Sequence, residues 1–234
     1  MTGVNIGDFD GGGRLADLVR AVDKVEGLQR LRISSIDPDE VDEDLTDAVL
    51  NGKTTAPSMH LVLQSGSNVI LKRMNRKYTR QIFLDTFEKL KRQKPEFTAT
   101  TDVIVGFPGE TEEDFEQTLE ILRHVRFAKV HWFPYSPRKR TRAALYPNQV
   151  PPDVMKKRKI EMQHVAETAS FALREQFLGS KMKVLLEGTE EEGFISGHTE
   201  NFLKVSLPAH GLRANDLVEC TLIENTPLGL IGRL

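Results

Sequence analysis

Cysteine is almost absent from this sequence: Cys220 is the single one among 234 residues. One cysteine excludes an intrachain disulfide, and it excludes any zinc or iron–sulfur site whose cysteine ligands all come from this chain. Cys220 occupies an alternating position within DLVECTLIEN, which is a strand-like pattern. We therefore expect a packed thiol and not a reactive one.

Long apolar stretches and targeting segments are missing too. No run of about 18 uninterrupted apolar residues is present that could span a bilayer. The first residues, MTGVNIGDFDGGG, contain neither the basic segment nor the apolar segment of a secretory signal. We therefore expect a cytoplasmic protein without a membrane partner.

The motifs of several large enzyme classes are also absent. The sequence contains no GxSxG, no HExxH and no Walker loop. The residues alone therefore identify no catalytic side chain and no metal ligand.

Charge is unevenly distributed, although the net charge at pH 7 is only −2. Residues 123–159 contain eleven Lys or Arg and one acid, Asp153, whereas residues 37–47 contain seven Asp or Glu. Local patches, and not the total charge, decide whether a polyanion can dock. We expect one face of the molecule to attract an anion and another to repel it.

Residues 1–150 alternate short β-rich runs with amphipathic helical patterns. Such alternation predicts a parallel sheet with crossover helices, which places the chain in the α/β class. A closed barrel of this kind needs eight strands and roughly 250 residues, so about four strands predict a partial, open β/α barrel. The expected strands are RLRISSI (30–36), MHLVLQSG (59–66), FTATTDVIVGF (97–107) and KVHWFPYS (129–136), with VNI (4–6) as a further candidate strand end. The expected helices between them are at 40–52, 67–75, 79–93 and 112–125.

Residues 151–179 predict a connecting helix that begins after two prolines, runs to about Phe177 and is ended by Gly179. Residues 180–234 then change to short strand patterns separated by turn residues. Five short strands in about 55 residues predict a small β-barrel that resembles the OB type. The expected strands are KMKVLLEG (181–188), FISGHT (194–199), FLKVSLP (202–208), DLVECTLIEN (216–225) and LGLIGRL (228–234).

The segment TTDVIVGFPGETEEDF (100–115) turns from an apolar strand into an acidic helix at the corner GFPG (106–109). A Gly-rich corner before a helix raises the question of a phosphate site. Local charge argues against one, because Pro108 has no N–H and several carboxylates crowd the first helical turn.

Two interpretations of this corner remain open. It is a turn whose helix is capped by Thr111 and Asp114, or it is a small-residue opening at the end of a barrel strand, where ligands bind. In the second case Gly106 lets a flat group such as a nucleobase approach closely, and Asp102 accepts hydrogen bonds from it.

Small polar residues end two further strands. QSGS (64–67) follows the apolar run HLVL, and a pair of serines closes the strand at 30–36. Their amide and hydroxyl groups suit sugar hydroxyls, whereas an N-cap for the helix near Asn68 is the commoner explanation for any one serine. His60 at the start of its strand is interpreted as a packed residue. The ligand-binding candidates among these polar residues are Ser34, Gln64 and Ser65.

Basic residues are interleaved with aromatic ones in KRMNRKYTR (72–80) and HWFPYSPRKRTRAALY (131–146), and KKRK (156–159) adds a third cluster. Cations neutralise phosphates and aromatic rings stack on bases, which is the usual pairing for RNA recognition. A solvated basic face is the alternative for any single cluster, but three clusters favour nucleic acid. The candidate RNA contacts are Lys72, Arg73, Arg76, Lys77, Arg138, Lys139 and Arg140.

Taken together, these segments resemble the radical S-adenosylmethionine methylthiotransferases of tRNA, and most closely the branch that acts on threonylcarbamoyladenosine next to the anticodon. The resemblance covers nearly the whole chain. The carboxyl-terminal words GHTENFLKV and GLIG resemble the family's TRAM domain. The other matching pieces, in order, are TGVNIGDF, RLRISSIDP, HLVLQSGSNVILKRMNRKYTR, TTDVIVGFPGETEEDF and FPYSPRKRTRAA.

The resemblance implies S-adenosylmethionine as the cofactor and tRNA as the partner, which the basic clusters and the TRAM-like barrel would grip. By motif position, the implied cofactor contacts are Thr2 and Asn5 at its amino acid end, Gln64 and Ser65 at its ribose, and Asp102, Gly106, Phe133 and Tyr135 around its adenine, with Ser34 as a further contact. The chain departs from the family at RKRTRAA, where Arg140 stands in place of an expected glycine.

The resemblance also implies a 4Fe-4S cluster on a CxxxCxxC loop just upstream of the TGVNIG-like segment, and a second cluster on an amino-terminal domain. This chain contains neither set of cysteines. Because reduction of S-adenosylmethionine needs the cluster's electron, we expect the isolated chain to be unable to generate the radical or insert sulfur. The explanations are a start codon placed too late, a split gene whose other half supplies the clusters, or a decayed remnant. One alternative function is that of a non-catalytic tRNA-binding or RNA-binding protein, either a remnant or a subunit of a split enzyme, and another is that of a barrel enzyme with unrelated chemistry.

Overall fold

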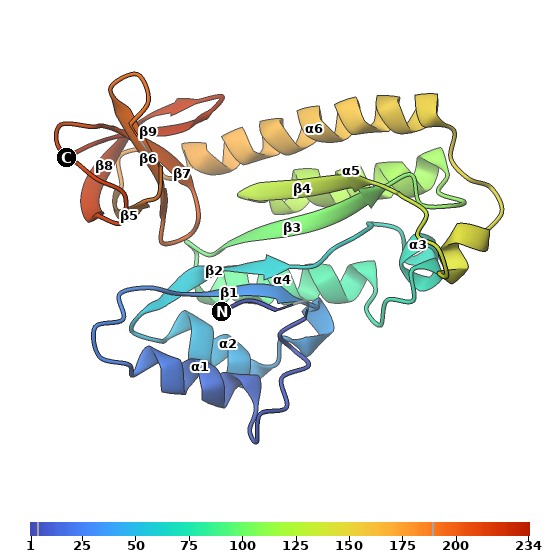
Figure 1. Cartoon of the computed structure of the whole chain (residues 1–234), viewed down its shortest axis with the longest axis horizontal. Helices are drawn as coiled ribbons and strands as arrows, with labels where there is room; N and C mark the ends of the chain where they lie inside the picture. Colours follow the sequence, from blue (N-terminus) through green and yellow to red (C-terminus); the bar gives the residue numbers. More distant parts are fainter. Residues whose placement is uncertain (4, 189) are drawn as a thin grey trace.

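The computed structural model describes residues 1–3, 5–188 and 190–234, and its first part is built on a four-stranded sheet (Figure 1). The strands are paired in the order β1-β2-β3-β4, and all three pairings are parallel, which confirms the predicted sheet. Val4 of the expected VNI strand end lies outside the described residues, and the two residues that follow it are not in a strand. The strands are β1 (Leu31–Ile36), β2 (Thr55–Leu61), β3 (Thr98–Val105) and β4 (Lys129–Pro134).

Helices connect the strands and cover the sheet, as the alternation predicts. The capping box at the start of α5 is present: Thr111 Oγ1 accepts from the Asp114 N–H at 3.1 Å, and the Asp114 carboxylate accepts from the Thr111 N–H at 2.9 Å. The helices of this part are α1 (Leu15–Asp23), α2 (Glu43–Leu50), α3 (Asn68–Arg73), α4 (Arg80–Gln93) and α5 (Glu112–Val125), with 3-10 turns η1 (Pro38–Glu40) and η2 (Arg142–Leu145).

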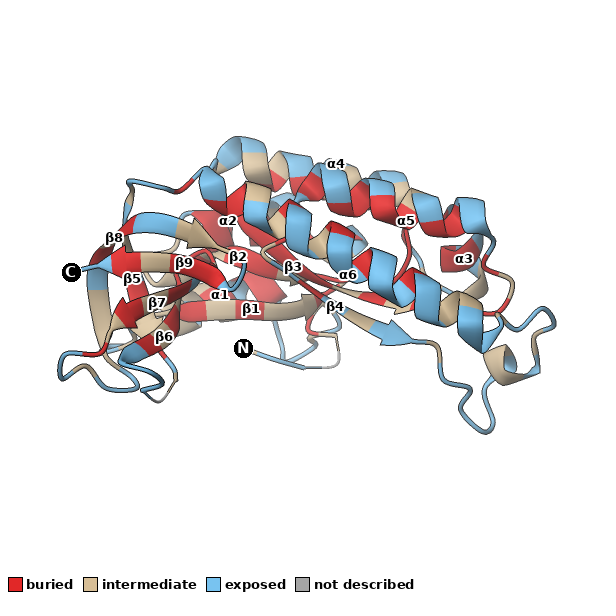
Figure 2. Ribbon diagram, turned by 90° about the horizontal axis from the view of Figure 1, so that it is seen from above, coloured by how far each residue is buried: buried red, intermediate tan, exposed pale blue. Residues whose placement is uncertain are grey.

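The core of this part lies between the sheet and the helices (Figure 2). Phe83 on α4 and Phe127, just before β4, are fully buried with their ring centroids 5.9 Å apart. Phe97 and Phe115 are buried in the same cluster. These rings fix α4 and α5 against the sheet, so the strand ends that carry the candidate site are held by a packed core.

A long helix, α6 (Pro152–Glu175), leads from the first part to a closed barrel of strand order β5-β6-β7-β9-β8. The predicted five-strand barrel is therefore confirmed. Cys220 is buried in its core, where burial raises the pKa of the thiol, as expected for a packed cysteine. The barrel strands are β5 (Lys181–Leu186), β6 (Phe194–Thr199), β7 (Lys204–Pro208), β8 (Leu217–Thr226) and β9 (Gly229–Arg233). The division of the chain at 150 and 180 stays a prediction.

Hydrogen bonds join the barrel to the amino end of the sheet. The Arg30 guanidinium, just before β1, donates to the His198 carbonyl at 2.9 Å, and the Asn201 amide donates to the Glu96 carbonyl, just before β3, at 3.0 Å. The Thr98 hydroxyl, at the start of β3, also donates to the carbonyl of Asn201. The carboxyl ends of the strands consequently face away from the barrel (Figure 1). In the described part of the chain no helix is long and apolar enough to cross a membrane.

Candidate functional site

Alternate side chains of β3 point away from the helical core, because successive residues of a strand face opposite sides of the sheet. Val103 and Val105 belong to the core, whereas Asp102 and Ile104 lie on the other face. On the neighbouring strand β2, His60 Nδ1 lies 3.0 Å from Thr100 Oγ1, and His60 Nε2 lies 3.4 Å from Asp102 Oδ2. The Asp102 carboxylate keeps 32% of its surface exposed, so it can still accept hydrogen bonds from a ligand.

Two histidines lie on this face: His60, which the sequence interpretation took as a packed residue, and His131, which it did not single out. His131 lies opposite Asp102 in the β3–β4 register, and its ring centroid is 6.2 Å from that of His60. Partial desolvation lowers the pKa of His131, which favours a neutral ring at pH 7. The signal available in the sequence was alternation, because His131 lies two residues from Phe133, a predicted cofactor contact on the same strand.

Gln64 and Ser65 extend β2 past its last regular residue. The Gln64 N–H donates to the Asp102 carbonyl at 2.8 Å, and the Ile104 N–H donates to the Gln64 carbonyl at 2.9 Å, so Gln64 lies directly beside β3. Gln64 has φ 59°, the left-handed conformation that reverses the chain there. The Ser65 hydroxyl is fully buried and accepts from the Ser67 N–H at 3.2 Å. Ser65 thus serves the turn, and its contact with a cofactor stays a prediction.

The cap interpretation is correct for Ser67. Its hydroxyl accepts from the Val69 N–H at 3.2 Å at the start of α3, and it donates to Asp114 Oδ1 at 2.5 Å. Gly66 packs its backbone against α5 and donates its N–H to Thr118 Oγ1 at 2.8 Å. The QSGS turn is therefore locked onto the capping box of α5.

The amino-terminal segment lies at the end of β1. The Ile6 N–H donates to the Ser35 carbonyl at 3.1 Å, and the Asn5 amide donates to Glu40 Oε1 at 3.0 Å. Burial raises the pKa of Glu40, whose second carboxylate oxygen is buried and has no hydrogen-bond partner within the described residues. Thr2 is exposed and Ser34 is half-buried. The structure thus brings Asn5 to the same strand-end edge as Gln64 and Asp102.

Gly106 does not offer the open space that the sequence interpretation gave it. Its φ is +78°, and a Cβ at this position would lie 2.5 Å from Cγ of Met155 on α6. A nucleobase therefore has no room on that side. The Gly106 N–H donates to Glu110 Oε2 at 2.8 Å, so a carboxylate occupies the amide that a phosphate would need. The corner is a capped turn packed under α6, and contact between Gly106 and a cofactor stays a prediction.

Two aromatic residues, Phe133 at the end of β4 and Tyr135 just after it, lie beside this corner. The Tyr135 N–H donates to the Val105 carbonyl at 2.8 Å, and the Tyr135 ring meets the Phe107 ring edge-on at 5.2 Å between centroids. The Tyr135 hydroxyl is buried and has no partner in the part of the chain that the structure describes. Phe133, opposite Ile104 in the register, is 52% exposed and presents a free ring surface.

A pocket of about 470 Å³ joins the first two basic clusters at this edge of the sheet. The Arg73 guanidinium lies 5.8 Å from the ring centroid of Tyr146. Four of the predicted RNA contacts, Lys77, Arg138, Lys139 and Arg140, are not among the residues that line the pocket. The lining residues are Lys72, Arg73, Met74, Asn75, Arg76, Ile104, Phe107, Arg142, Ala143 and Tyr146.

Arg140 stands where the resemblance led us to expect glycine, and it adopts a left-handed conformation that favours glycine, with φ 71°. The following Thr141 closes the turn by donating its hydroxyl to the Arg138 carbonyl at 2.8 Å. The loop geometry expected for glycine is therefore kept, with an exposed cation at a position that favours glycine.

The prediction of a third basic cluster at KKRK is wrong for one of its four residues, Arg158, which does not belong to the basic surface. Arg158 is buried and its guanidinium donates to Glu110 Oε2 at 2.8 Å and to Glu112 Oε2 at 3.1 Å. The physical reason is helical periodicity, which turns one residue in each turn of α6 toward the sheet. Lys156, Lys157 and Lys159 stay exposed.

The fold and this strand-end site define a class of protein: the family model of the radical SAM superfamily matches residues 4–122, and the chain belongs to that family. In addition, the chain is 48% identical over its whole length to the threonylcarbamoyladenosine tRNA methylthiotransferase MtaB of Chlamydia pneumoniae, of which it covers 56%. It is 39% identical over 87% of its length to the Thermotoga maritima protein of the same name, of which it covers 48%. The chain thus spans about half the length of these curated relatives.

Two further comparisons agree with this assignment. The tRNA-2-methylthio-N(6)-dimethylallyladenosine synthase of Desulfitobacterium hafniense is 37% identical over 96% of the chain, which covers 51% of that enzyme. Among solved structures, coproporphyrinogen III oxidase (HemN) of Escherichia coli, a radical SAM enzyme, superposes with a TM-score of 0.50 at 14% identity, over 72% of this chain and 46% of that one. The latter likeness concerns the fold alone.

The residues at the strand ends fit an adenosine-containing cofactor. Phe133 offers a ring for stacking, the Asp102 carboxylate is an acceptor for an amino group, and the buried Tyr135 hydroxyl lacks a partner within the described residues. An iron–sulfur cluster does not fit this chain, because its one cysteine, Cys220, is buried in the distant barrel.

Proposed function

We propose that this chain is the cofactor-binding and tRNA-binding part of a tRNA methylthiotransferase that acts on threonylcarbamoyladenosine in the anticodon loop. One observation carries the proposal. Ile104 lines the cationic pocket and lies two residues from Asp102 on the same face of β3. A cofactor held at Asp102 and an RNA held in the pocket would therefore meet at one strand end.

In this proposal S-adenosylmethionine, once reduced, supplies the radical and methyl chemistry. Asp102 accepts hydrogen bonds from the adenine, with the Phe133 ring and Tyr135 beside it and Gly106 at the turn behind. Gln64, Ser65 and Ser34 lie near the ribose. Asn5 and Thr2 lie near the amino acid end, on the segment that packs along the end of β1.

The RNA contacts divide into two sets. Lys72, Arg73 and Arg76 line the pocket, where their cations can neutralise phosphates of the anticodon loop. Outside the pocket, Lys77 follows α3, and Arg138, Lys139 and Arg140 lie on the exposed loop after β4. We also propose that the closed barrel is a TRAM-like domain that grips the tRNA, and that the protein works in the cytoplasm.

We further propose that this chain alone cannot start the reaction, because its residues cannot hold the cluster. The test is a chimera in which the chain replaces the matching 56% of the Chlamydia pneumoniae relative. With the cluster reconstituted, the chimera is expected to form the methylthiolated nucleoside in tRNA, measured by mass spectrometry of digested tRNA. The chain by itself is expected to form none. Product from the isolated chain, or a folded chimera without product, would contradict the proposal.

Binding to tRNA is the second test. For the isolated chain, the affinity measured by fluorescence anisotropy should fall steeply as salt rises, because bound cations release counterions from the RNA. Lys72→Gln/Arg73→Gln should lower the slope of log affinity against log salt by roughly 1.4 to 1.8, since each lost phosphate contact contributes about 0.7 to 0.9. The control, Lys24→Gln/Lys53→Gln, removes two exposed cations elsewhere and should leave the slope unchanged. A tRNA affinity that does not change with salt concentration would contradict the assignment of the pocket as an RNA-binding site.

A non-catalytic RNA-binding protein is the second candidate, and the cysteine content favours it. The pocket and the barrel need no iron to bind RNA. The two candidates separate in the chimera, because a remnant that only binds tRNA would give tight binding and no modified nucleoside.

A further inference from the structure

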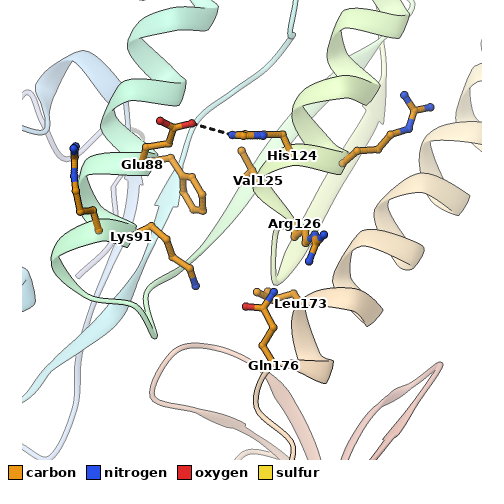
Figure 3. Close-up of a pocket in the computed structure, with 10 residues that line it drawn as sticks. Glu88, Lys91, His124, Val125, Arg126, Leu173 and Gln176 are labelled. Carbon is orange, nitrogen blue, oxygen red and sulfur yellow. Dashed lines mark hydrogen bonds and ion pairs between the residues drawn. The ribbon is translucent and has the colours of Figure 1, made fainter.

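A second cationic groove is drawn in Figure 3. It lies at the amino end of the sheet, since its Lys91 bonds to Phe97 just before β3, whereas the pocket described above lies at the carboxyl end. It has a volume of about 580 Å³ and is formed by the carboxyl ends of three helices, α4, α5 and α6. Figure 3 shows Lys91, Arg126 and Gln176 on three different elements around one gap. The lining residues are Phe87, Glu88, Lys91, Arg92, Arg123, His124, Val125, Arg126, Leu173 and Gln176.

The groove is positive in a chain whose net charge is −2. Its lining contains four Lys or Arg and one carboxylate, Glu88, which lies 2.9 Å from His124 Nε2. Lys91 Nζ donates to the Phe97 carbonyl at 3.1 Å, which leaves two of its three donors for a ligand. Arg123 Nη1 lies 2.6 Å from Glu116 Oε1, so Lys91, Arg92 and Arg126 supply the charged donors that remain for a ligand.

Arg126 is an unusual choice for its position. It ends α5 with φ 54° and ψ 67°, the left-handed conformation that glycine adopts at helix ends with less strain. A cation there also interacts favourably with the carboxyl end of the helix. The exposed guanidinium places a charge in the groove at the expense of backbone strain, which points to a ligand that needs it.

The lining selects the chemistry of that ligand. Guanidinium, ammonium and amide groups donate hydrogen bonds to phosphate oxygens. Apart from His124, the lining has one aromatic residue, Phe87, which is buried and offers no surface on which a base could stack. Leu173 lines the groove and also belongs to the core of the barrel. The groove is therefore continuous with the barrel that we propose to hold tRNA.

We propose that this groove binds the phosphate backbone of the tRNA as a second anchor, independent of base sequence. The inference rests on the proposed tRNA-binding function. The eight residues of β3 separate the two cationic sites by roughly 25 Å. A mononucleotide or free phosphate cannot contact both ends at once, and an RNA stem can.

The test compares Arg92→Gln/Arg126→Gly with the wild-type chain and with the Lys24→Gln/Lys53→Gln control. Both groove residues are exposed, and glycine suits the backbone of position 126, so thermal unfolding should occur at the same or a higher temperature. We expect tRNA affinity to fall about tenfold at low salt, with a salt slope lower by roughly 1.4 to 1.8, for tRNAs of unrelated sequence alike. Inorganic phosphate, added at constant ionic strength, should not displace tRNA from the wild-type chain.

Each outcome bears on a different claim. If the groove variant keeps the tRNA affinity and salt slope of the wild-type chain while the pocket variant loses affinity, the proposal that the groove binds tRNA is overturned. The proposed function would then stay intact. Displacement by phosphate at low millimolar concentration would also overturn the groove proposal, because the site would then take a small anion. A wild-type chain that binds no tRNA would contradict the groove and the proposed RNA-binding function together.

Discussion

Arg158→Leu should lower the free energy of unfolding by about 3–5 kcal/mol at pH 8, because it leaves the Glu110 carboxylate buried without its partner. The two side chains are 6% and 1% exposed and lie 2.8 Å apart. Their ion pair joins α6 to the turn at the end of β3, where the Gly106 N–H also donates to Glu110. Urea denaturation followed by circular dichroism measures the loss.

The loss of unfolding free energy in Arg158→Leu should be smaller at pH 6, because Glu110 can then be protonated. Burial raises the pKa of Glu110 to about 7, which outweighs the attraction of Arg158. When folding raises the pKa of a carboxyl group, its protonated form contributes stability to the fold. This contribution is complete at pH values below the ordinary pKa of 4.5, and it is lost as the pH rises through 7. Without Arg158 the pKa of Glu110 rises further, so the variant takes up a proton at pH 6 and avoids a bare buried charge.

Two variants control this prediction. Glu112→Gln removes the other partner of the same guanidinium, but Glu112 is 76% exposed, so the cost should stay below about 1 kcal/mol. Glu110→Gln/Arg158→Leu removes both charges and keeps an acceptor for the Gly106 N–H, and it should recover part of the lost stability. Equal losses at pH 6 and pH 8, or a double variant as unstable as Arg158→Leu, would refute the account.

Gly66→Ala should cost about 1–3 kcal/mol and should abolish most product formation by the chimera, because the added methyl group has no room. A Cβ at Gly66 would lie 2.4 Å from the Gln117 carbonyl oxygen and 2.5 Å from Thr118 Cα, both of which belong to the backbone of α5. The turn that carries Gln64 must then move away from the helix, and the proposed ribose contacts move with it.

The matched control is Gly13→Ala. Gly13 is exposed, and a Cβ there would meet only the Asp17 side chain at 3.5 Å, an ordinary contact distance. Its stability should change by no more than about 0.5 kcal/mol. If Gly66→Ala proves as stable and as active as Gly13→Ala, the close packing of the QSGS turn on α5 does not matter for the site.

The order of elements, the parallel sheet and the five-strand barrel could all be predicted from the residues, because hydrophobic periodicity and turn residues are local properties of the chain. The sequence also offered the cap of α5 as one of two interpretations of the corner, and it showed the absence of a cysteine set for a cluster. Small polar residues at strand ends indicated which side chains meet at one edge of the sheet, since parallel strands bring their carboxyl ends together; that a ligand binds there stays a prediction.

The tertiary structure alone decided which side each residue faces and what fills the space beside it. Met155 closes the opening that Gly106 suggested, and Arg158 leaves the basic surface to pair with Glu110. Both belong to α6, a helix about 50 residues away in sequence from the residues that it covers. Local patterns carry no record of such long-range packing, which is why the residues at the strand ends could be named from the sequence and the free space beside them could not.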